Sequence, residues 1–101
     1  MMTHNPNPTA VTDRNAQAML EALAQAFERE NAAQEAYDAA VSKAYASGKV
    51  DGKNAEIRGA QLSEIIAPQQ AALNKAKSEV ELARTKIALY KAWLYSTVSL
   101  P

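Results

Sequence analysis

The sequence predicts an all-α protein, an antiparallel two-helix hairpin with coiled-coil-like packing. Two long alanine-rich stretches, 11–47 and 54–98, flank one short segment of Gly, Lys and Asp at 48–53. Alanine is the strongest helix former, and 22 of the 101 residues are alanine. A single glycine-bounded turn between two such stretches favours helices that fold back on each other. We therefore expect one helical domain over residues 12–98.

The first arm is predicted to be a helix over residues 12–47, preceded by a flexible leader at 1–11. Thr12 followed by Asp13 fits a helix start with a capping hydroxyl and an acidic first turn. Gly48 suits the left-handed residue that follows a helix end. Apolar residues at a spacing of three and four predict a buried stripe on this helix. The stripe comprises Ala16, Leu20, Leu23, Phe27, Glu30, Gln34, Tyr37, Val41 and Ala44, and a line of small residues runs beside it at Met19, Ala26, Ala33 and Ala40.

The second arm is predicted to span 54–98, with Asn54 as its cap. Its heptad spacing is regular and indicates a coiled-coil-like seam. The seam comprises Leu62, Ile66, Gln69, Leu73, Ala76, Val80, Ala83, Ile87, Tyr90 and Leu94. Pro68 lacks a backbone donor and its ring clashes with the carbonyl of Glu64, so we expect a kink or break near 67–68. The alternative is a three-helix arrangement, with helices at 54–66 and 69–98.

A turn centred near Val50 would pair residues whose numbers add to roughly 101. Leu20 would then face Val80, and Phe27 would face Leu73. The polar seam positions Glu30 and Gln34 would meet Gln69, forming a polar layer that fixes the register.

The composition narrows the classes of function. Eleven basic and eleven acidic residues cancel, which argues against a dedicated non-specific nucleic-acid binder. The chain has no cysteine, and its single histidine, His4, lies in the leader. We therefore expect no enzyme, no catalytic residues, no metal site and no cofactor. No apolar run approaches the roughly 18 residues of a membrane helix, and no signal-peptide pattern is present, so we expect a cytoplasmic protein with no membrane partner.

The carboxyl-terminal end of the second arm carries more apolar surface than a hairpin can bury. It extends past the first helix in the predicted register, and Leu82, Leu89 and Trp93 form a second apolar line beside the seam. We expect a protein partner there. The predicted interface comprises Leu82, Leu89, Trp93, Leu94 and Tyr95.

Charged residues repeat every seven positions on both arms. We interpret these rows either as solvated helix faces or as residues that form ion pairs between subunits. The acidic row is Glu21, Glu28 and Glu35, and the basic row is Lys77, Arg84 and Lys91. The basic row is a candidate contact for nucleic acid, although Glu79 and Glu81 interrupt it, so nucleic acid is not the favoured partner. A basic tip at Lys49, Lys53 and Arg58 is a further candidate contact for an anionic partner, although a purely structural turn is the favoured interpretation of this segment.

The run Gly52-Lys53-Asn54-Ala55-Glu56-Ile57-Arg58 leads into a long helix. It resembles small helical proteins of bacteriophages and prophages, in which a Gly-Lys-Asn-x-Glu-x-Arg run joins two coiled-coil-like helices. The resemblance implies a bacterial host cell and no catalytic residues, and a proline such as Pro68 departs from the pattern. We expect a non-enzymatic phage or prophage accessory protein that forms a dimer and binds a partner protein through its carboxyl-terminal aromatic end. The alternatives are a nucleic-acid-associated accessory factor using the basic row, and a virion structural or assembly component.

Overall fold

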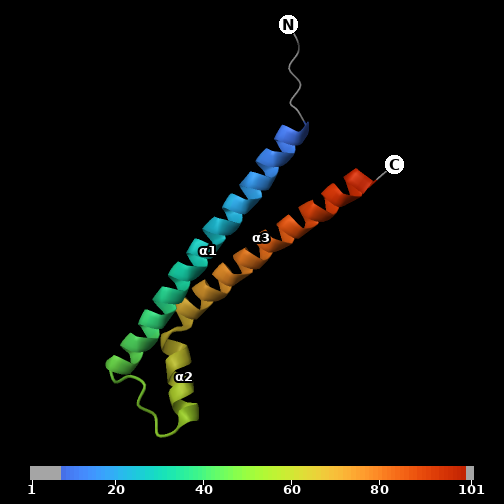
Figure 1. Ribbon diagram of the computed structural model, residues 1–101. Helices are drawn as coiled ribbons and strands as arrows, with labels where there is room; N and C mark the ends of the chain where they lie inside the picture. Colours follow the sequence, from blue (N-terminus) through green and yellow to red (C-terminus); the bar gives the residue numbers. More distant parts are fainter. Residues whose placement is uncertain (1–7, 100–101) are drawn as a thin grey trace.

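The computed structural model describes the backbone of residues 8–99 and the side chains of 14–96. This part of the chain forms three helices, α1 (Pro8–Ala46), α2 (Ala55–Ile65) and α3 (Ala67–Ser99). The helices α1 and α3 run antiparallel and pack against each other, while the short α2 lies near the end where α1 finishes and α3 begins (Figure 1). The all-α prediction is confirmed for these residues.

The first helix begins earlier than predicted and ends where predicted. It starts at Pro8 rather than at Thr12, so Thr12 lies inside the helix and is not its cap. Proline is favoured at a first helical position, because its missing N–H would have no intrahelical partner there. Residues 8–11 of the predicted flexible leader are therefore helical, and residues 1–7 lie outside the described range. At the other end Gly48 has a φ of 76°, which confirms it as the left-handed residue after the helix.

The connection between α1 and α2 is an ordered loop held by two side chains of α2. The Gln61 side-chain oxygen accepts hydrogen bonds from the backbone N–H of Asp51 (3.1 Å) and Gly52 (2.8 Å), and its Nε2 donates to Asp51 Oδ1 (3.0 Å). Arg58 donates to the carbonyl oxygen of Gly52 at 3.0 Å. Asn54 accepts from the N–H of Ile57 at 2.9 Å, which confirms it as the cap of α2. The loop and α2 therefore form one hydrogen-bonded unit.

The second arm is broken, as the alternative with three helices requires. A single residue, Ile66, separates α2 from α3, and it leaves helical geometry with φ −96° and ψ 8°. Pro68 lies in the first turn of α3, where its missing N–H costs no helical hydrogen bond. The carbonyl of Ile66 accepts from the N–H of Gln70 at 2.9 Å and so starts α3. The second arm is therefore broken rather than kinked, at Ile66 and so one residue before the predicted 67–68, and the two-helix hairpin is not confirmed.

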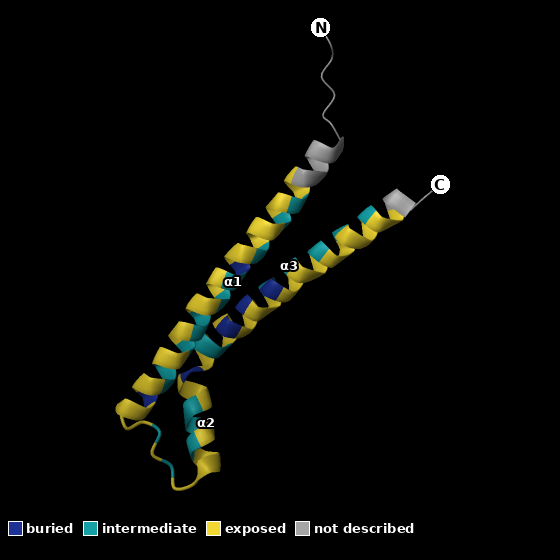
Figure 2. Cartoon of the chain, in the orientation of Figure 1, coloured by how far each residue is buried: buried dark blue, intermediate teal, exposed yellow. Residues whose placement is uncertain are grey.

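The core is small and lies at the lower half of the α1–α3 pair (Figure 2). Its six buried hydrophobic residues are Ala26, Ala44, Ile66, Leu73, Ala76 and Val80. Every residue of the predicted seam of the second arm is buried or half-buried, so that stripe is confirmed residue by residue. Because the buried side chains are mostly small, the two helices approach closely over this half.

The stripe predicted for the first arm is confirmed except at Leu20. Eight of its nine residues are buried or half-buried, whereas Leu20 is 59% exposed. The line of small residues beside the stripe also faces α3: Ala26 is 1% exposed, and Met19, Ala33 and Ala40 are half-buried. The face that α1 turns toward α3 therefore comprises both lines.

The register of the pair also differs from the prediction. Arg29 binds Glu79, and Phe27 contacts Arg84 rather than Leu73. Leu20 lies beside Ile87 rather than Val80. The helices are displaced by about two turns because the connection is not a tight turn: α2 folds as a separate unit between them.

Candidate interaction surface

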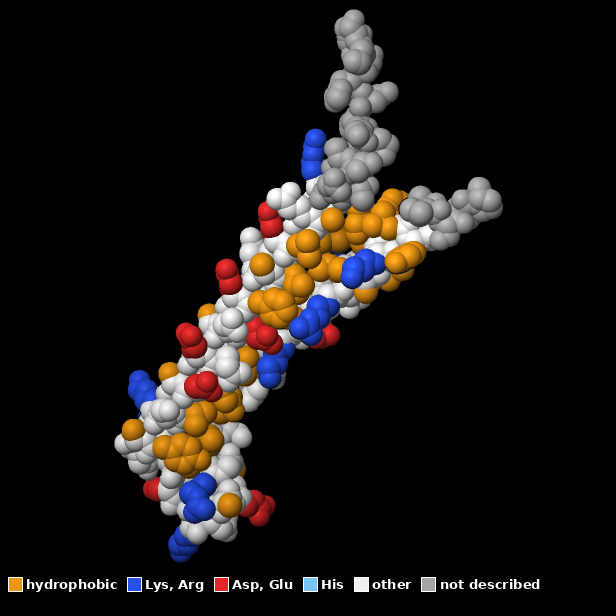
Figure 3. Space-filling view, viewed as in Figure 1, with side chains coloured by type: hydrophobic (Ala, Val, Ile, Leu, Met, Phe, Trp, Pro, Cys, Tyr) orange, Lys and Arg blue, Asp and Glu red, His pale blue; other side chains and the backbone are white. Residues whose placement is uncertain are grey.

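The upper half of the α1–α3 pair is open. Among the described side chains, none is buried before Ala26 in α1 or after Val80 in α3. Figure 3 shows hydrophobic side chains gathered where the two helices diverge, with acidic side chains along α1 and basic ones along α3. The upper half of the pair therefore exposes hydrophobic side chains, whereas the lower half buries them.

One side of the open half contains an apolar hollow of about 220 Å³. Its lining consists of Ala16, Met19, Leu20, Ile87, Tyr90, Lys91 and Leu94. Leu94, which was predicted for the partner interface, is thus half-buried in the seam and lines this hollow.

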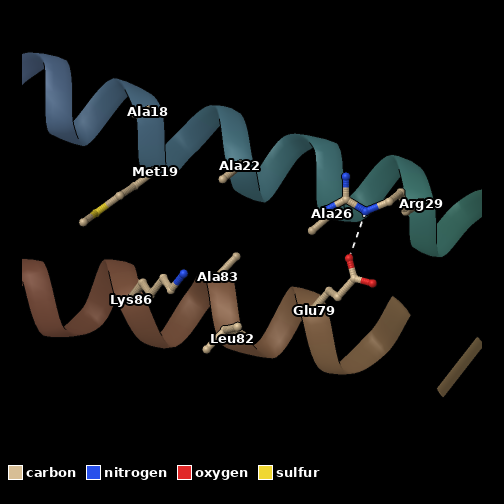
Figure 4. Close-up of a pocket in the computed structure, with 9 residues that line it drawn as sticks. All are labelled: Ala18, Met19, Ala22, Ala26, Arg29, Glu79, Leu82, Ala83 and Lys86. Carbon is tan, nitrogen blue, oxygen red and sulfur yellow. Dashed lines mark hydrogen bonds and ion pairs between the residues drawn. The ribbon is translucent and has the colours of Figure 1, made fainter. Parts of the chain in front are cut away.

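The opposite side contains a larger groove of about 430 Å³ between the helices (Figure 4). Its lining consists of Ala18, Met19, Ala22, Ala26 and Arg29 from α1 and Glu79, Leu82, Ala83 and Lys86 from α3. Ala18 and Leu20 are two residues apart, about 200° around a helix, so the groove and the hollow lie on opposite faces of the pair. Most of the groove's α1 wall is alanine, and the Arg29–Glu79 ion pair closes its lower end (Figure 4).

The predicted partner residues are exposed but do not form one patch. Leu82 (56%), Leu89 (65%) and Trp93 (56%) share the groove side of α3, and Trp93 stacks on Tyr90 with ring centroids 5.9 Å apart. Tyr95 is 75% exposed and lies more than a quarter-turn away from this line. The structure therefore brings three of the five predicted interface residues together on one face.

The basic row is exposed along α3, and Arg84 is its most constrained member. Arg84 donates to Glu81 at 3.3 Å, and its guanidinium lies 5.3 Å from the centroid of the Phe27 ring. Lys77 and Lys91 are exposed. At the tip, Lys49 and Lys53 are exposed, but Arg58 is half-buried and bound to the loop. The predicted basic tip thus loses Arg58 to a structural role.

The predicted polar layer does not form. Gln34 donates to Asp38 of its own helix at 3.0 Å. Gln69 lies against Ala40 and Ala44, and its buried side-chain oxygen has no hydrogen-bond partner. The displaced register carries Gln69 past Gln34 toward the end of α1.

Other kinds of site find no support in the described residues. No three His, Cys, Asp or Glu side chains of this part of the chain gather as metal ligands. None of its helices combines the length and the apolar character needed to cross a bilayer. Comparisons with protein-family models, with curated proteins and with solved structures find no match to this chain.

Proposed function

We propose that this chain is a non-enzymatic phage or prophage accessory protein of the bacterial cytoplasm. It self-associates, and it binds a partner protein through the carboxyl-terminal part of α3. The observation that carries the proposal is the open half of the α1–α3 pair, where Leu82, Leu89 and Trp93 are each more than half exposed beside an apolar groove. Large exposed apolar patches on small proteins mark interaction sites.

The accessible surface supports self-association. A compact monomer of 10.9 kDa exposes about 5,600 Å², whereas this chain exposes 7686 Å². Counted as fully extended, the nine terminal residues outside 8–99 account for at most about 1,500 Å² of this. An excess of about 600 Å² remains after that subtraction, and a contact of that size on each copy, about 1,200 Å² in total, lies at the lower limit of stable protein interfaces.

The phage or prophage setting rests on the run from Gly52 to Arg58. In the structure Asn54 caps α2, and Arg58 holds the carbonyl of Gly52. These roles are structural, which agrees with a family whose shared run implies no catalysis.

Sedimentation at micromolar concentration tests self-association. We expect a dimer, and we expect Trp93→Ala to raise its dissociation constant at least tenfold. Lys77→Ala is the matched control on the same helix and should leave the dimer unchanged, because Lys77 is exposed on the side of α3 away from Trp93. A monomer at every concentration, with no effect of Trp93→Ala, would exclude self-association.

The exposed basic row supports a second candidate, contact with single-stranded nucleic acid. Lys77, Arg84 and Lys91 follow one line of α3, and neutralising phosphates with such a row gives steep salt dependence. We would then expect binding to single-stranded DNA to weaken sharply with salt and to be lost in the Lys77/Arg84 double alanine variant. Binding that is absent or insensitive to salt excludes this candidate.

A further inference from the structure

We propose that the α1–α3 pair binds an amphipathic helix of another protein on its hollow face. This face is the side of the pair that contains the apolar hollow lined by Leu20 and Ile87, opposite the groove. The bound helix places one large apolar side chain in the hollow and carboxylates beside the basic row Lys77, Arg84 and Lys91. The inference rests on the proposed binding of a partner protein, and it specifies the face and the chemistry of that partner.

The basic row runs along the α3 edge of the hollow face. Lys91 lines the hollow itself. The guanidinium of Arg84, seven residues earlier, lies 5.3 Å from the centroid of the Phe27 ring of α1. Residues seven apart differ by only about 20° around a helix, so Lys77 lies on the same face. Figure 3 shows basic side chains along α3 beside the hydrophobic cluster between the helices.

The row leaves positive charge without an acidic partner in the described part of the chain. The two carboxylates of α3 are both engaged, since Glu81 pairs with Arg84 and Glu79 belongs to the ion pair that closes the groove. Among the described side chains, Lys77 and Lys91 form no ion pair. The α1 residues that line the hollow are uncharged. A partner complementary to this face therefore carries carboxylates on the side that meets α3.

The hollow has the size of one inserted side chain. Six of its seven lining residues are apolar or aromatic, and its volume is about 220 Å³. A cavity of about 150 Å³ holds one benzene molecule, whereas sites for drug-sized ligands have about 300–1,000 Å³. Leu20 forms part of the wall and is 59% exposed, so the hollow opens to the surface. It therefore fits an aromatic or leucine anchor of a docked helix better than a cofactor.

An amphipathic helix satisfies the hollow and the basic row at once. Such a helix lays apolar anchors, three, four and seven residues apart, into a hydrophobic groove. A helix of about 14 residues matches the distance of about 21 Å from Lys77 to Lys91 along α3. Carboxylates seven residues apart on its flank then have the same spacing as the three cations of the row.

A second copy of this chain does not offer such a helix. Its exposed carboxylates recur on α1 in the acidic row Glu21, Glu28 and Glu35. Residues three or four positions from these carboxylates share a helix surface with them. Every one of these neighbours, from Gln17 to Ala39, is an alanine or a polar residue. The acidic row therefore lacks a large apolar anchor for the hollow.

The hollow face also differs from a surface built for nucleic acid. Interfaces with nucleic acid are polar and strongly basic, whereas most of the lining of this hollow is apolar. The carboxylate of Glu81, 3.3 Å from Arg84, adds negative charge within the basic row. A phosphate chain along the row would meet this carboxylate and leave the hollow unfilled.

Binding of two matched synthetic peptides to the full-length chain tests the inference. Both peptides are amphipathic helices of about 18 residues, with one phenylalanine anchor and leucines at a spacing of three and four. One carries glutamates every seven residues along its flank, and the other carries lysines at the same positions. We expect fluorescence anisotropy to show that the glutamate peptide binds at least about tenfold more tightly than the lysine peptide.

Charge reversal on α3 identifies the face. Lys91→Glu should weaken binding of the glutamate peptide at least about fivefold and strengthen binding of the lysine peptide. Lys86→Glu is the matched control, because it makes the same charge change on the groove side of α3. At physiological salt, where exposed charges interact over about 8 Å, it should change either affinity by less than about twofold. Both lysines are exposed, so circular dichroism should show unchanged helicity.

The results distinguish the occupants of this face. Equal affinity for the two peptides, or equal effects of the two charge reversals, overturns the inference. Peptide binding that Trp93→Ala removes and Lys91→Glu leaves unchanged lies in the groove, which overturns the inference and leaves the proposed partner binding standing.

Three further results would also overturn the inference. Displacement of the glutamate peptide by an oligothymidine of about 20 nucleotides assigns the face to nucleic acid. Loss of the dimer in Lys91→Glu, measured by sedimentation, assigns the face to a second copy and leaves self-association standing. Binding of neither peptide overturns the inference, and together with a monomer at every concentration it overturns the proposed function as well.

Discussion

Arg29 of α1 and Glu79 of α3 form an ion pair across the helix contact, with Arg29 Nε 3.0 Å from Glu79 Oε2. The pair lies at the boundary between the buried lower half and the open upper half. Its side chains are 54% and 35% exposed, so water screens the attraction. The ion pair therefore shows the register of α1 against α3, but it contributes little to the stability of the fold.

We therefore expect Arg29→Ala to lower the free energy of unfolding by less than about 1 kcal/mol. A double-mutant cycle with Glu79→Ala, measured by urea denaturation, isolates the pair. A coupling energy of several kcal/mol would contradict this prediction, because it would show that the ion pair contributes strongly to the contact between α1 and α3.

Truncation in the lower half should cost far more than truncation in the upper half. Leu73 is 3% exposed, and Leu73→Ala is expected to destabilise by about 2–5 kcal/mol through lost burial and a cavity. Leu89→Ala is the control of identical chemistry, and because Leu89 is 65% exposed it should change monomer stability by less than about 0.5 kcal/mol. Thermal unfolding at a concentration below the dimer range measures both. Equal losses would contradict the assignment of the core.

Gly52 should resist substitution because its neighbours leave no room for a side chain. A Cβ atom at Gly52 would collide with the side chain of Ile57. We expect Gly52→Ala to destabilise by about 1–3 kcal/mol and to loosen the loop. Gly59 is the control in α2, since a Cβ there meets nothing within 4 Å. Gly59→Ala should stabilise by about 0.5–1 kcal/mol, because alanine is the better helix former. A Gly52→Ala variant that is as stable as the natural protein in chemical denaturation would refute the loop packing.

Pro68 is expected to contribute modestly. It occupies a first-turn position that suits proline, so its main effect is to restrict the unfolded chain. Pro68→Ala should therefore lower the free energy of unfolding by about 0.4–1 kcal/mol. It should leave helicity unchanged if Ile66, which is 3% exposed, holds the joint between α2 and α3 by burial. A gain in both stability and helicity would indicate that α2 and α3 merge into one helix once proline is removed.

Much of the fold follows from signals that act over a few residues. Gly48 and Asn54 marked a helix end and a helix start because a left-handed backbone and a side-chain cap are local requirements. Pro68 marked the break for the same reason, since its ring and its missing N–H act on the preceding turn. The regular heptad spacing of the second arm also predicted which of its residues are buried or half-buried.

The candidate surface was predicted in part. Leu82, Leu89 and Trp93 stood out because they repeat beside a seam that was already complete. The groove that Leu82 lines was not predicted, because it depends on how far the two helices diverge.

The sequence by itself therefore determined where helices begin, end and break, and which face of the second arm is buried. Only the tertiary structure decided the register in which α1 meets α3. Small side chains recur along the contact face of α1, so several registers could pack almost equally well and local pattern does not choose among them. The register follows from how the loop and α2 join the two long helices, where Gln61 and Arg58 bind the loop, and from the contact of α1 with α3, where Arg29 reaches Glu79, 50 residues away in sequence.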